Sequence, residues 1–353
     1  MNAVRWHARG DVRYEWVPDP LPPGEGELRV EVAYCGLCGS DVHEYTSGPA
    51  QIPTSPHPLT GCSAPIVLGH EVSGRVSAVG AGVDLAIGTA VVLNALEPCG
   101  RCDACVQGAL ERCEILGHIG ISADGGLAES LNVPLAMVVP LPDGISLDVA
   151  ALAEPFAVAA HALGQAGYPR GQTCAVLGAG AIGLATALLL RDLGNVVVIG
   201  DSDSARLQIP AALGFEPLDY DTSGYSTVFE CAGAPGAVRD AIQLTASGGL
   251  TVLAGLPIDN VEIDVRDLVL REVRLIGSVG HLVDPDLTHA VRFLADHATE
   301  ARALITAVIP LQVAVSQGLD LLAGPGRNSH VKVLVEVFGE AGAATDSAPE
   351  ATE

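Results

Sequence analysis

Four cysteines within fifteen residues constrain the fold of this chain more than any other feature, and they are Cys99, Cys102, Cys105 and Cys113. Two-residue gaps bring thiolates from one turn toward a common centre, and four thiolates complete the closed tetrahedral shell of a structural zinc ion. Such a closed site holds a loop together and leaves no position open for chemistry. A pair of disulfides is the alternative, which the reducing compartment expected below disfavours.

Size and composition indicate a globular enzyme of two domains. The chain has 353 residues, of which 49% are hydrophobic and 17% charged, enough to bury two cores. Its net charge of −24 argues against nucleic acid or an anionic membrane surface as a partner. The first five residues lack the apolar stretch of a secretory signal. We therefore expect a cytoplasmic protein.

One apolar run, residues 173–190, reaches the length of a membrane span without a charge. Three glycines lie at its centre, so a buried strand followed by a helix explains this run better. From about Gly171 onward, apolar strands alternate with helical segments, which is typical of a parallel α/β domain. Helices are expected after Gly180, Ser202, Pro235 and Pro285. Strands are expected at 173–177, 196–200, 227–231, 250–255 and 274–278.

The first part of the chain has a different pattern. Residues 28–32 and 71–76 alternate apolar and polar side chains, as half-buried strands do, so a largely antiparallel β domain is expected. After about residue 298 come a strand at 307–310, a helix near 313–322 and a strand at 331–338. The tail, 339–353, has nothing to bury and is expected to be disordered.

The third crossover of the α/β domain is predicted to lack its helix. Only eight residues, 219–226, separate a third strand near 216–218 from the strand at 227–231. A parallel crossover commonly takes a dozen or more residues, usually as a helix. Passing two strands diagonally requires about 22 Å, and eight extended residues reach about 27 Å. The sheet can therefore close without a helix.

A glycine-rich turn predicts a dinucleotide site. Residues 178–183 read Gly178-Ala179-Gly180-Ala181-Ile182-Gly183, follow an apolar strand and open a helix. The glycines allow a tight turn, close approach of the backbone to a pyrophosphate, and close packing of the helix on the strand. A turn of this kind without a ligand is the alternative.

The residue at the end of the second strand indicates which dinucleotide binds. Asp201 should accept hydrogen bonds from the adenosine ribose hydroxyls. A 2′-phosphate would meet both Asp201 and Asp203, so NAD is favoured over NADP. Arg206 is the nearby cation that could soften this preference.

A second group of motifs offers one thiolate, one imidazole and one carboxylate. Cys38 lies in Cys35-Gly36-Leu37-Cys38-Gly39-Ser40-Asp41-Val42-His43, His70 in Gly69-His70-Glu71, and Glu154 in Ala153-Glu154-Pro155. Three such ligands would leave the open position of a catalytic zinc. Spacing alone does not gather them, and Glu154 could instead cap a helix. Cysteines at 35, 62, 174 and 231 are expected to be buried apolar side chains.

These motifs, in this order, resemble the zinc-containing medium-chain dehydrogenases/reductases, the alcohol dehydrogenase superfamily, from the N-terminus to about Phe338. Within it the chain is most similar to the 2,3-butanediol and sorbitol dehydrogenase branch, on residues 38–45, 57–61 and 153–155. The resemblance implies Cys38, His70 and Glu154 as zinc ligands, with Glu71 able to exchange onto the metal.

The resemblance also implies the architecture. A GroES-like domain would span 1–155 with the zinc lobe at 97–115, a Rossmann domain would span 156–297, and 298–338 would return to the first domain. Further cofactor contacts are expected at Gly255, Ser278 and Lys332. Two zinc ions per chain and NAD are the implied cofactors. A homodimer or homotetramer would form through the strand at 250–255 and its neighbours.

The implied reaction is hydride transfer between a secondary carbinol carbon, as in a vicinal diol, and NAD. Ser40 and His43 occupy the positions from which relatives pass the proton through the nicotinamide ribose to water, and a histidine suits this task. His43 could instead be an exposed loop residue. Reduction of a C=N or C=C bond on the same scaffold, or a non-catalytic zinc and nucleotide-binding protein, are the alternatives.

Two residues that differ from those usual in this branch bear on which substrate binds. His118 and His281 stand where relatives usually carry apolar or aromatic residues, which would make the pocket more polar or fit it to another substrate. Glu44, Tyr45 and the loop 57–61 are candidates for contacts that distinguish a diol from a simple alcohol.

Overall fold

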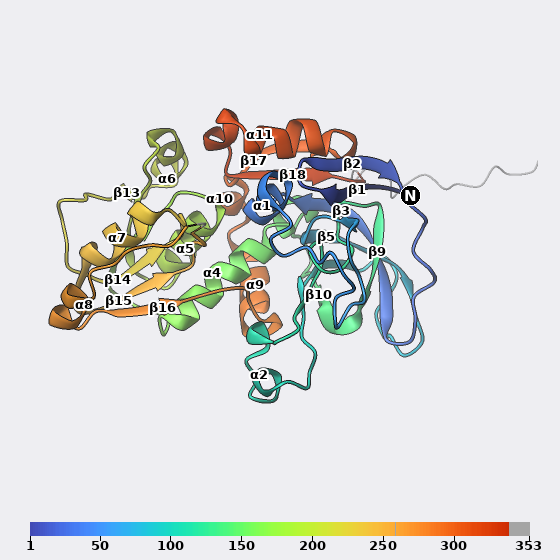
Figure 1. The fold of residues 1–353 in the computed structure, drawn as a ribbon, viewed down its shortest axis with the longest axis horizontal. Helices are drawn as coiled ribbons and strands as arrows, with labels where there is room; N and C mark the ends of the chain where they lie inside the picture. The colour runs from blue at the N-terminus through green and yellow to red at the C-terminus, as the bar shows by residue number, and fades with distance from the viewer. Residues whose placement is uncertain (258, 339–353) are drawn as a thin grey trace, which may run out of the picture.

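The computed structural model describes residues 1–257 and 259–338, so the predicted disordered tail lies outside the described residues. A six-stranded sheet with its helices lies on the left of Figure 1, and a β-rich part lies on the right. Helix α4 (Ala153–Gln165) runs between the two, and its buried residues belong to the largest apolar core.

The β-rich part is built from one seven-stranded sheet and two smaller ones. In the large sheet the central strand β3 has the expected alternation, with Leu28, Val30 and Val32 buried and Glu31 exposed. The strands of the large sheet are β10 (Val138–Pro140), β6 (Ala90–Leu93), β5 (Glu71–Val79), β3 (Glu27–Gly36), β18 (Lys332–Glu336) and β17 (Ile305–Pro310), with β9 (Ser130–Pro134) paired to β3. The small sheets hold β2 (Asp11–Trp16), β1 (Asn2–Ala8) and β4 (Ile66–Val67), and β7 (Leu96–Glu97) with β8 (Gly117–His118).

The last described strands return to this first sheet. β18 pairs antiparallel with β3, with Leu334 opposite Gly36 and Val335 opposite Cys35, and parallel with β17. Because β3 also pairs with β5, residues near the two ends of the chain meet in adjacent strands.

The second sheet is a parallel Rossmann sheet, so the predicted fold class is confirmed. Its strands run in the order 3-2-1-4-5-6, as in doubly wound dinucleotide-binding folds. Two of the predicted strands have the predicted bounds, and the others differ by one to five residues at their ends. In spatial order the strands are β13 (Glu216–Pro217), β12 (Val196–Gly200), β11 (Thr173–Leu177), β14 (Tyr225–Glu230), β15 (Thr245–Leu253) and β16 (Arg274–Gly277).

Helices follow each of the predicted start positions. The predicted helix near 313–322 is instead broken into a 3₁₀ turn, a π-helical turn and a short α-helix. The α-helices besides α4 are α1 (Gly39–Ser47), α2 (Asp103–Val106), α3 (Leu147–Ala150), α5 (Ala181–Asp192), α6 (Gln208–Ala212), α7 (Pro235–Leu244), α8 (Val265–Arg271), α9 (Thr288–Asp296), α10 (Ala298–Arg302) and α11 (Asp320–Ala323). The 3₁₀ helices are η1 (Leu110–Arg112), η2 (Leu135–Met137), η3 (Ser204–Leu207), η5 (Leu311–Val313) and η7 (Pro325–Ser329), and the π-helical turns are η4 (Val283–Leu287) and η6 (Ala314–Leu319).

The shortened third crossover is confirmed. Between Pro217 and Tyr225 the chain forms no helix. Leu218 and Tyr225 are buried against Ala241 and Leu244 of α7 and against the sheet. Two side chains of the connecting loop and its neighbours therefore cover a surface that a crossover helix commonly covers.

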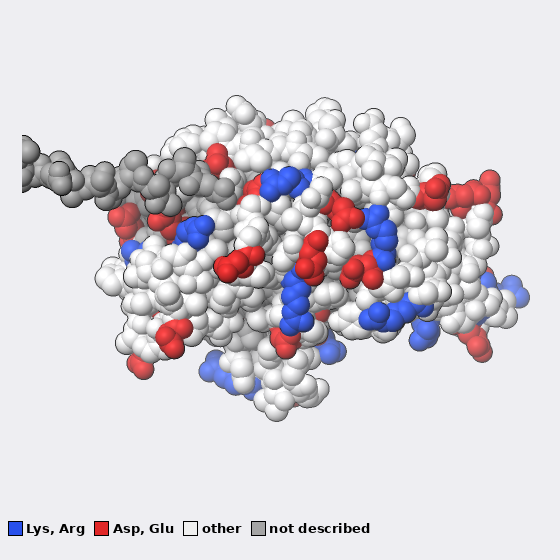
Figure 2. All heavy atoms as spheres, turned by 180° about the vertical axis from the view of Figure 1, so that it is seen from behind, with Lys and Arg blue, Asp and Glu red and all other residues white. Residues whose placement is uncertain are grey.

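The surface carries both signs of charge despite the acidic net charge. Figure 2 shows acidic and basic side chains interspersed over one face of the molecule. Within the part of the chain that the structure describes, none of the helices has the length and apolar character needed to cross a bilayer.

Candidate active site

Cys38 lies at the N-terminus of helix α1. It occupies the N-cap position with an extended backbone (φ −101°, ψ 158°), and its amide donates a hydrogen bond of 2.9 Å to the carboxylate of Asp41. The positive end of the helix dipole favours a thiolate at this position. Cys38 is therefore held at the start of α1 by its own backbone.

His70 is oriented by a buried carboxylate that the sequence analysis did not identify. Its Nδ1 lies 3.8 Å from Oδ1 of Asp41, and Asp41 is fully buried. Burial opposes a charged imidazole, but Asp41, Cys38 and Glu154 together outweigh it and raise the pKa of His70 well above its usual range. With Nδ1 facing Asp41, the other ring nitrogen is left for a metal ion. The sequence could have indicated this role of Asp41, because Asp41 lies three residues after Cys38, where a side chain can cap the start of a helix.

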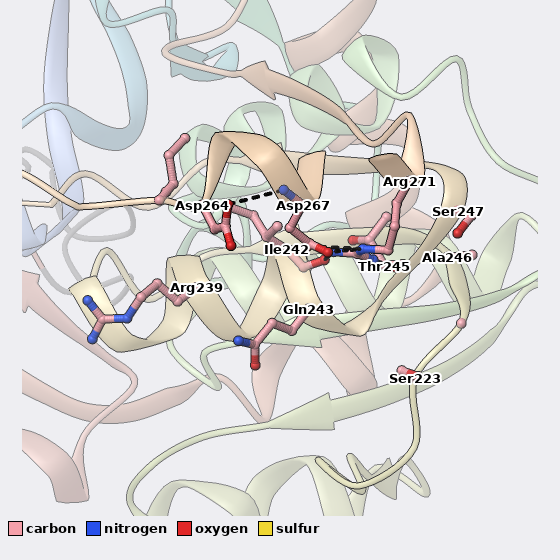
Figure 3. Close-up of a pocket in the computed structure, with 12 residues that line it drawn as sticks. Ser223, Arg239, Ile242, Gln243, Thr245, Ala246, Ser247, Asp264, Asp267 and Arg271 are labelled. Atoms are coloured by element: carbon pink, nitrogen blue, oxygen red, sulfur yellow. Dashed lines mark hydrogen bonds and ion pairs between the residues drawn. The ribbon is translucent and has the colours of Figure 1, made fainter. Parts of the chain in front are cut away.

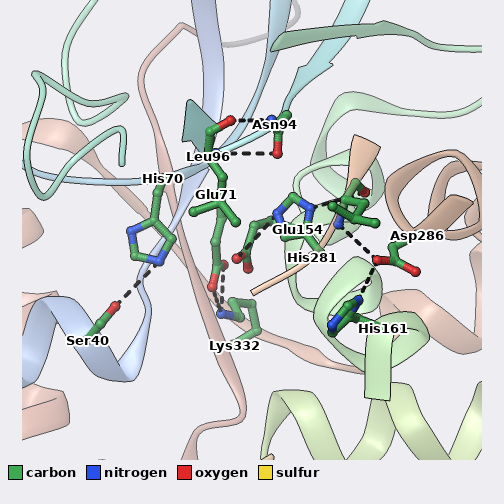
Figure 4. A network of polar contacts seen from close by, with 11 residues as sticks. Ser40, His70, Glu71, Asn94, Leu96, Glu154, His161, His281, Asp286 and Lys332 are labelled. Atoms are coloured by element: carbon green, nitrogen blue, oxygen red, sulfur yellow. Dashed lines mark hydrogen bonds and ion pairs between the residues drawn. The ribbon is translucent and has the colours of Figure 1, made fainter. Parts of the chain in front are cut away.

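Glu71 forms a buried ion pair with the only lysine of the chain (Figure 4). Nζ of Lys332 lies 2.5 and 2.6 Å from the two carboxylate oxygens and 3.1 Å from the carbonyl oxygen of Leu37. Both side chains are almost fully buried. Lys332 is predicted above to contact the cofactor, and here its ammonium group contacts three oxygen atoms of the core.

The structure brings two of the three predicted zinc ligands, Cys38 and His70, close together. The ligand atoms of Cys38, His70 and Glu71 lie within 4.8 Å of one another. Glu154, the second residue of α4, is not part of that group, and its Oε1 lies 3.8 Å from Nε2 of His281. Burial raises the pKa of Glu154 to about 7. A bound cation would oppose this shift, because positive charge favours the ionised carboxylate.

The two predicted proton-relay residues lie on helix α1. Oγ of Ser40 is 3.5 Å from Nε2 of His70, which puts the hydroxyl beside the metal-ligand cluster. His43 is half-buried on the same helix, three residues further along, so the two side chains lie on one face.

Glu44 and Tyr45, proposed above as diol contacts, are engaged elsewhere. The carboxylate of Glu44 is buried and accepts hydrogen bonds from the amides of Ala50 and Gln51. The hydroxyl of Tyr45 donates to Asp320 of α11 at 2.7 Å. Both side chains therefore hold α1 in place.

Two further histidines border the metal-ligand cluster. The ring of His118 meets the ring of His70 edge-on, with centroids 5.0 Å apart, and His281 faces Glu154. Burial lowers the pKa of His118 well below its usual range and that of His281 to about 4. Both imidazoles are therefore neutral at pH 7.

The four-cysteine loop has the geometry of a metal site. All four sulfur atoms lie within 4.8 Å of one another, with Cys102 and Cys105 3.5 Å apart and Cys99 and Cys105 4.0 Å apart. A tetrahedral zinc tetrathiolate places sulfurs about 3.8 Å apart, whereas a disulfide has about 2.05 Å. Backbone amides donate to the sulfurs of Cys99 and Cys113, which also favours thiolates.

The glycine-rich turn has the close contacts expected of a dinucleotide site. Gly178 has φ +102°, and a Cβ there would lie 2.9 Å from the amide nitrogen of Ala232. Gly180 caps α5, and Ala181 and Ile182 begin that helix. Gly183 packs against the carbonyl of Gly178, where a side chain would overlap it. The amides at the start of α5 are thus open to an anion.

Asp201 is fixed at the end of β12 by two backbone amides. One carboxylate oxygen accepts from Ala179 at 2.8 Å and the other from Asp203 at 2.9 Å. Each oxygen keeps a further lone pair for a ribose hydroxyl. The guanidinium of Arg206 lies close to Gly180, about 3.3 Å from where a Cβ would be.

The other two predicted cofactor residues lie at the same edge of the sheet. Gly255 follows β15 and packs against Gly233, where a Cβ would overlap the backbone. Ser278 follows β16, and its hydroxyl is buried without a partner among the described residues. The ends of parallel strands at this edge are where dinucleotides bind.

A separate cavity of about 670 Å³ lies between α7, the start of β15 and α8 (Figure 3). Arg271 crosses it, donating to the carbonyls of Thr245 and Ile242 and pairing with Asp267. None of the predicted site residues lines this cavity, and Arg271 is already used to cap α7.

A dinucleotide-type sheet beside a cluster of metal-ligating side chains defines an oxidoreductase, and comparison with known families is consistent with this class. Residues 24–143 match the alcohol dehydrogenase GroES-like domain, and residues 147–337 match the glucose dehydrogenase C-terminus. The chain is 34% identical to (R,R)-butanediol dehydrogenase of Bacillus subtilis (strain 168), with 95% of this chain and 99% of the relative covered. The protein therefore belongs to the zinc-type alcohol dehydrogenases of the medium-chain dehydrogenase/reductase superfamily.

Solved structures agree in fold over nearly the whole chain. The X-ray crystal structure of 2R,3R-butanediol dehydrogenase from Bacillus subtilis has a TM-score of 0.88 and 32% identity, covering 96% of this chain and 99% of that one. A zinc-binding dehydrogenase from Sinorhizobium meliloti 1021 bound to NADP has a TM-score of 0.82 and 30% identity, covering 95% and 98%.

The Lys332–Glu71 pair yields a stability prediction. Lys332→Met should lower the free energy of unfolding by about 3–5 kcal/mol, because it leaves a buried carboxylate without a partner. The double variant Glu71→Gln/Lys332→Met should recover much of that loss, since no charge remains buried. Urea unfolding of the metal-free protein measures both.

Arg13→Met is the matched control, because it removes an exposed ion pair with Asp11 and should leave the unfolding midpoint unchanged. A double variant as unstable as Lys332→Met alone would show that the charge of Glu71 is not what the lysine compensates.

Proposed function

We propose that this protein oxidises secondary alcohols or vicinal diols with NAD and reduces the corresponding ketone or hydroxyketone in reverse. The observation that carries the proposal is the convergence of Cys38, His70 and Glu71 in a chain that also has a dinucleotide-type turn after β11. The butanediol dehydrogenases to which the chain is similar support the substrate class.

We propose Cys38, His70 and Glu154 as the ligands of a catalytic zinc. Thiolate, imidazole and carboxylate together fit zinc and leave a position for the substrate. Glu71 is the proposed exchange ligand. Both of its carboxylate oxygens contact Lys332 while it does not bind the metal. Bound zinc would supply Lewis acidity toward the substrate oxygen.

The chain's own residues orient the substrate and remove the proton. The Ser40 hydroxyl lies next to His70 and would accept the proton of the substrate alcohol. His43, on the same face of α1, would pass it to water, a task that suits an imidazole. A carbon–nitrogen or carbon–carbon double bond needs no such path from an alkoxide, so these groups favour alcohol oxidation over the alternative reductions.

NAD is the proposed hydride acceptor. The amides at the start of α5 would bind the pyrophosphate, and Asp201 would accept from the ribose hydroxyls. The carboxylates of Asp201 and Asp203 oppose a 2′-phosphate, whereas Arg206 near Gly180 would attract one. Two acidic groups against one basic group favour NAD.

A second, structural zinc is proposed for Cys99, Cys102, Cys105 and Cys113, whose sulfur separations are close to those of a tetrahedral tetrathiolate. None of the nine cysteines forms a disulfide, as suits a reducing compartment, which supports a cytoplasmic location.

We propose a homodimer formed through the edge of the Rossmann sheet. The predicted interface strand, 250–255, belongs to the inner strand β15, so the open edge is that of β16. Large apolar side chains are exposed nearby, Val269 at 69% and Leu270 at 71% on α8, and Leu256 at 76% after β15. An exposed apolar group beside an open strand is typical of a protein–protein interface.

The first test is the formation of NADH, followed by absorbance, with vicinal diols, polyols, simple secondary alcohols and acetoin. Diol-dependent activity that a chelator abolishes is expected, with kcat/KM for NAD at least about tenfold above that for NADP, equal to about 1.4 kcal/mol. If protein that contains zinc has no activity with any of these compounds, the proposed substrate class is wrong.

Zinc content should separate the two proposed metal sites. The unmodified protein should hold about two zinc ions per chain, Cys105→Ser should lose one of them, and Cys38→Ser should lose the other together with activity. Cys62→Ser, at a half-buried cysteine outside both clusters, should retain both ions. Mass spectrometry of the metal gives the counts, and a Cys105→Ser protein that keeps its full zinc content would contradict the assignment.

The oligomer is tested by light scattering during size-exclusion chromatography. The unmodified protein should have at least twice the chain mass of 36.0 kDa, and Val269→Asp should shift it toward the monomer because a charge is placed in the proposed interface. Leu21→Asp changes a side chain that is 81% exposed in the other domain and should leave the mass unchanged. An unmodified monomer would exclude the dimer.

A further inference from the structure

Two buried imidazole nitrogens next to the proposed catalytic zinc ligands have no hydrogen-bond partner. Within residues 1–257 and 259–338, Nε2 of His118 and Nε2 of His281 are both buried and unpaired. His281 is 2% exposed. Buried polar groups in native proteins are almost always satisfied, so each exception calls for an explanation.

Both rings lie beside proposed zinc ligands. The ring of His118 is 5.0 Å from that of His70, and Nε2 of His281 is 3.8 Å from Glu154. Figure 4 shows the His281 ring directed toward the Glu154 carboxylate, with His70 and Ser40 on the other side of the Glu71–Lys332 pair. The unpaired nitrogens thus belong to the surroundings of the metal-ligand cluster.

The position of His118 is fixed by its backbone. Its amide donates to Oγ of Ser122 at 2.9 Å, and its carbonyl accepts from the amides of Ile121, Ser122 and Ala123. The hydroxyl of Thr60, in the loop 57–61, donates to the carbonyl of Ser122. The loop proposed as a diol contact therefore acts on the pocket through His118, since it supports the turn that carries this ring.

His281 is held by a second set of buried contacts (Figure 4). Its Nδ1 lies 3.4 Å from the carbonyl of Leu282, and the amide of Leu282 donates to Asp286 at 2.9 Å. Asp286 is in turn paired with His161 at 2.8 Å. A carbonyl only accepts, so Nδ1 is assigned the hydrogen and Nε2 is left as an acceptor for a hydroxyl group.

We propose that His118 and His281 form a hydrogen-bonding subsite for substrate hydroxyl groups that flank the reacting carbon, so that the preferred substrate is a neutral polyhydroxylated compound and not a diol ending in methyl groups. This inference rests on the proposed function. A methyl group placed against these nitrogens would leave them unpaired, and a site built to bind a hydroxyl rejects the analogue that lacks it. A carboxylate would lie beside Glu154, Glu71 and Asp41, which disfavours an anionic substrate.

The test compares kcat/KM for butane-2,3-diol, a six-carbon polyol and a six-carbon aldonate, with NAD, in the unmodified enzyme and in His118→Phe and His281→Phe. The polyol should be the best substrate of the unmodified enzyme. Each variant should lower kcat/KM for the polyol at least about tenfold, about 1.4 kcal/mol, chiefly through KM. Values for butane-2,3-diol should stay level or rise.

Three further variants distinguish a change in substrate specificity from a loss of folding. His281→Gln keeps an amide near the position of Nε2 and should retain part of the polyol preference. His289→Phe, in α9 and outside the pocket, should leave all ratios unchanged. The double variant His118→Phe/His281→Phe should retain the zinc content and unfolding midpoint of a folded enzyme while favouring the diol.

The outcomes distinguish this inference from the function on which it rests. Activity toward none of the three probes would overturn the proposed function itself. Activity with equal losses on polyol and diol in the variants, or a polyol no better than the diol in the unmodified enzyme, would overturn the subsite alone. A preference for the aldonate would overturn the inference that the preferred substrate is neutral.

Discussion

A single buried ion pair, between Lys332 and Glu71, holds together the part of the molecule on which the metal-ligand cluster depends. Lys332 begins β18, Glu71 begins β5, and the carbonyl of Leu37 at the end of β3 accepts the third hydrogen bond. Burying two charges gains little net stability, but separating them is costly. The pair therefore links the three strands at this point, where His70 directly precedes Glu71 and Cys38 directly follows Leu37.

The sequence was most informative where the structure depends on neighbours along the chain. The strands at 173–177 and 196–200 have the predicted bounds, because continuous apolar runs between turn residues define buried parallel strands. The missing crossover helix followed from counting residues against the distance to be spanned. The four cysteines lie close together as expected, because the short gaps between them restrict how far apart their side chains can be.

Long-range partners could not be deduced in this way. Glu44 was placed in the substrate site, although its carboxylate binds backbone amides six and seven residues further on. The pairing of Lys332 with Glu71 was not predicted, because it spans 261 positions and depends on strand pairing that no local pattern specifies. Asp41 was read as part of a motif without a role, since its effect on His70 exists only once β5 lies beside α1.

The return of the last strand also determines when the first domain can be finished during synthesis. Every proposed metal ligand lies before residue 155, yet residues 34–36 of β3 lack a partner strand on one edge, and Glu71 has an uncompensated charge, until residues 332–336 arrive. Domains generally fold as they leave the ribosome, N-terminal first, but this one waits for the far end of the chain. A chain that stops early would carry all the ligands without the framework that gathers them, so assembly of the site reports that the polypeptide is nearly complete.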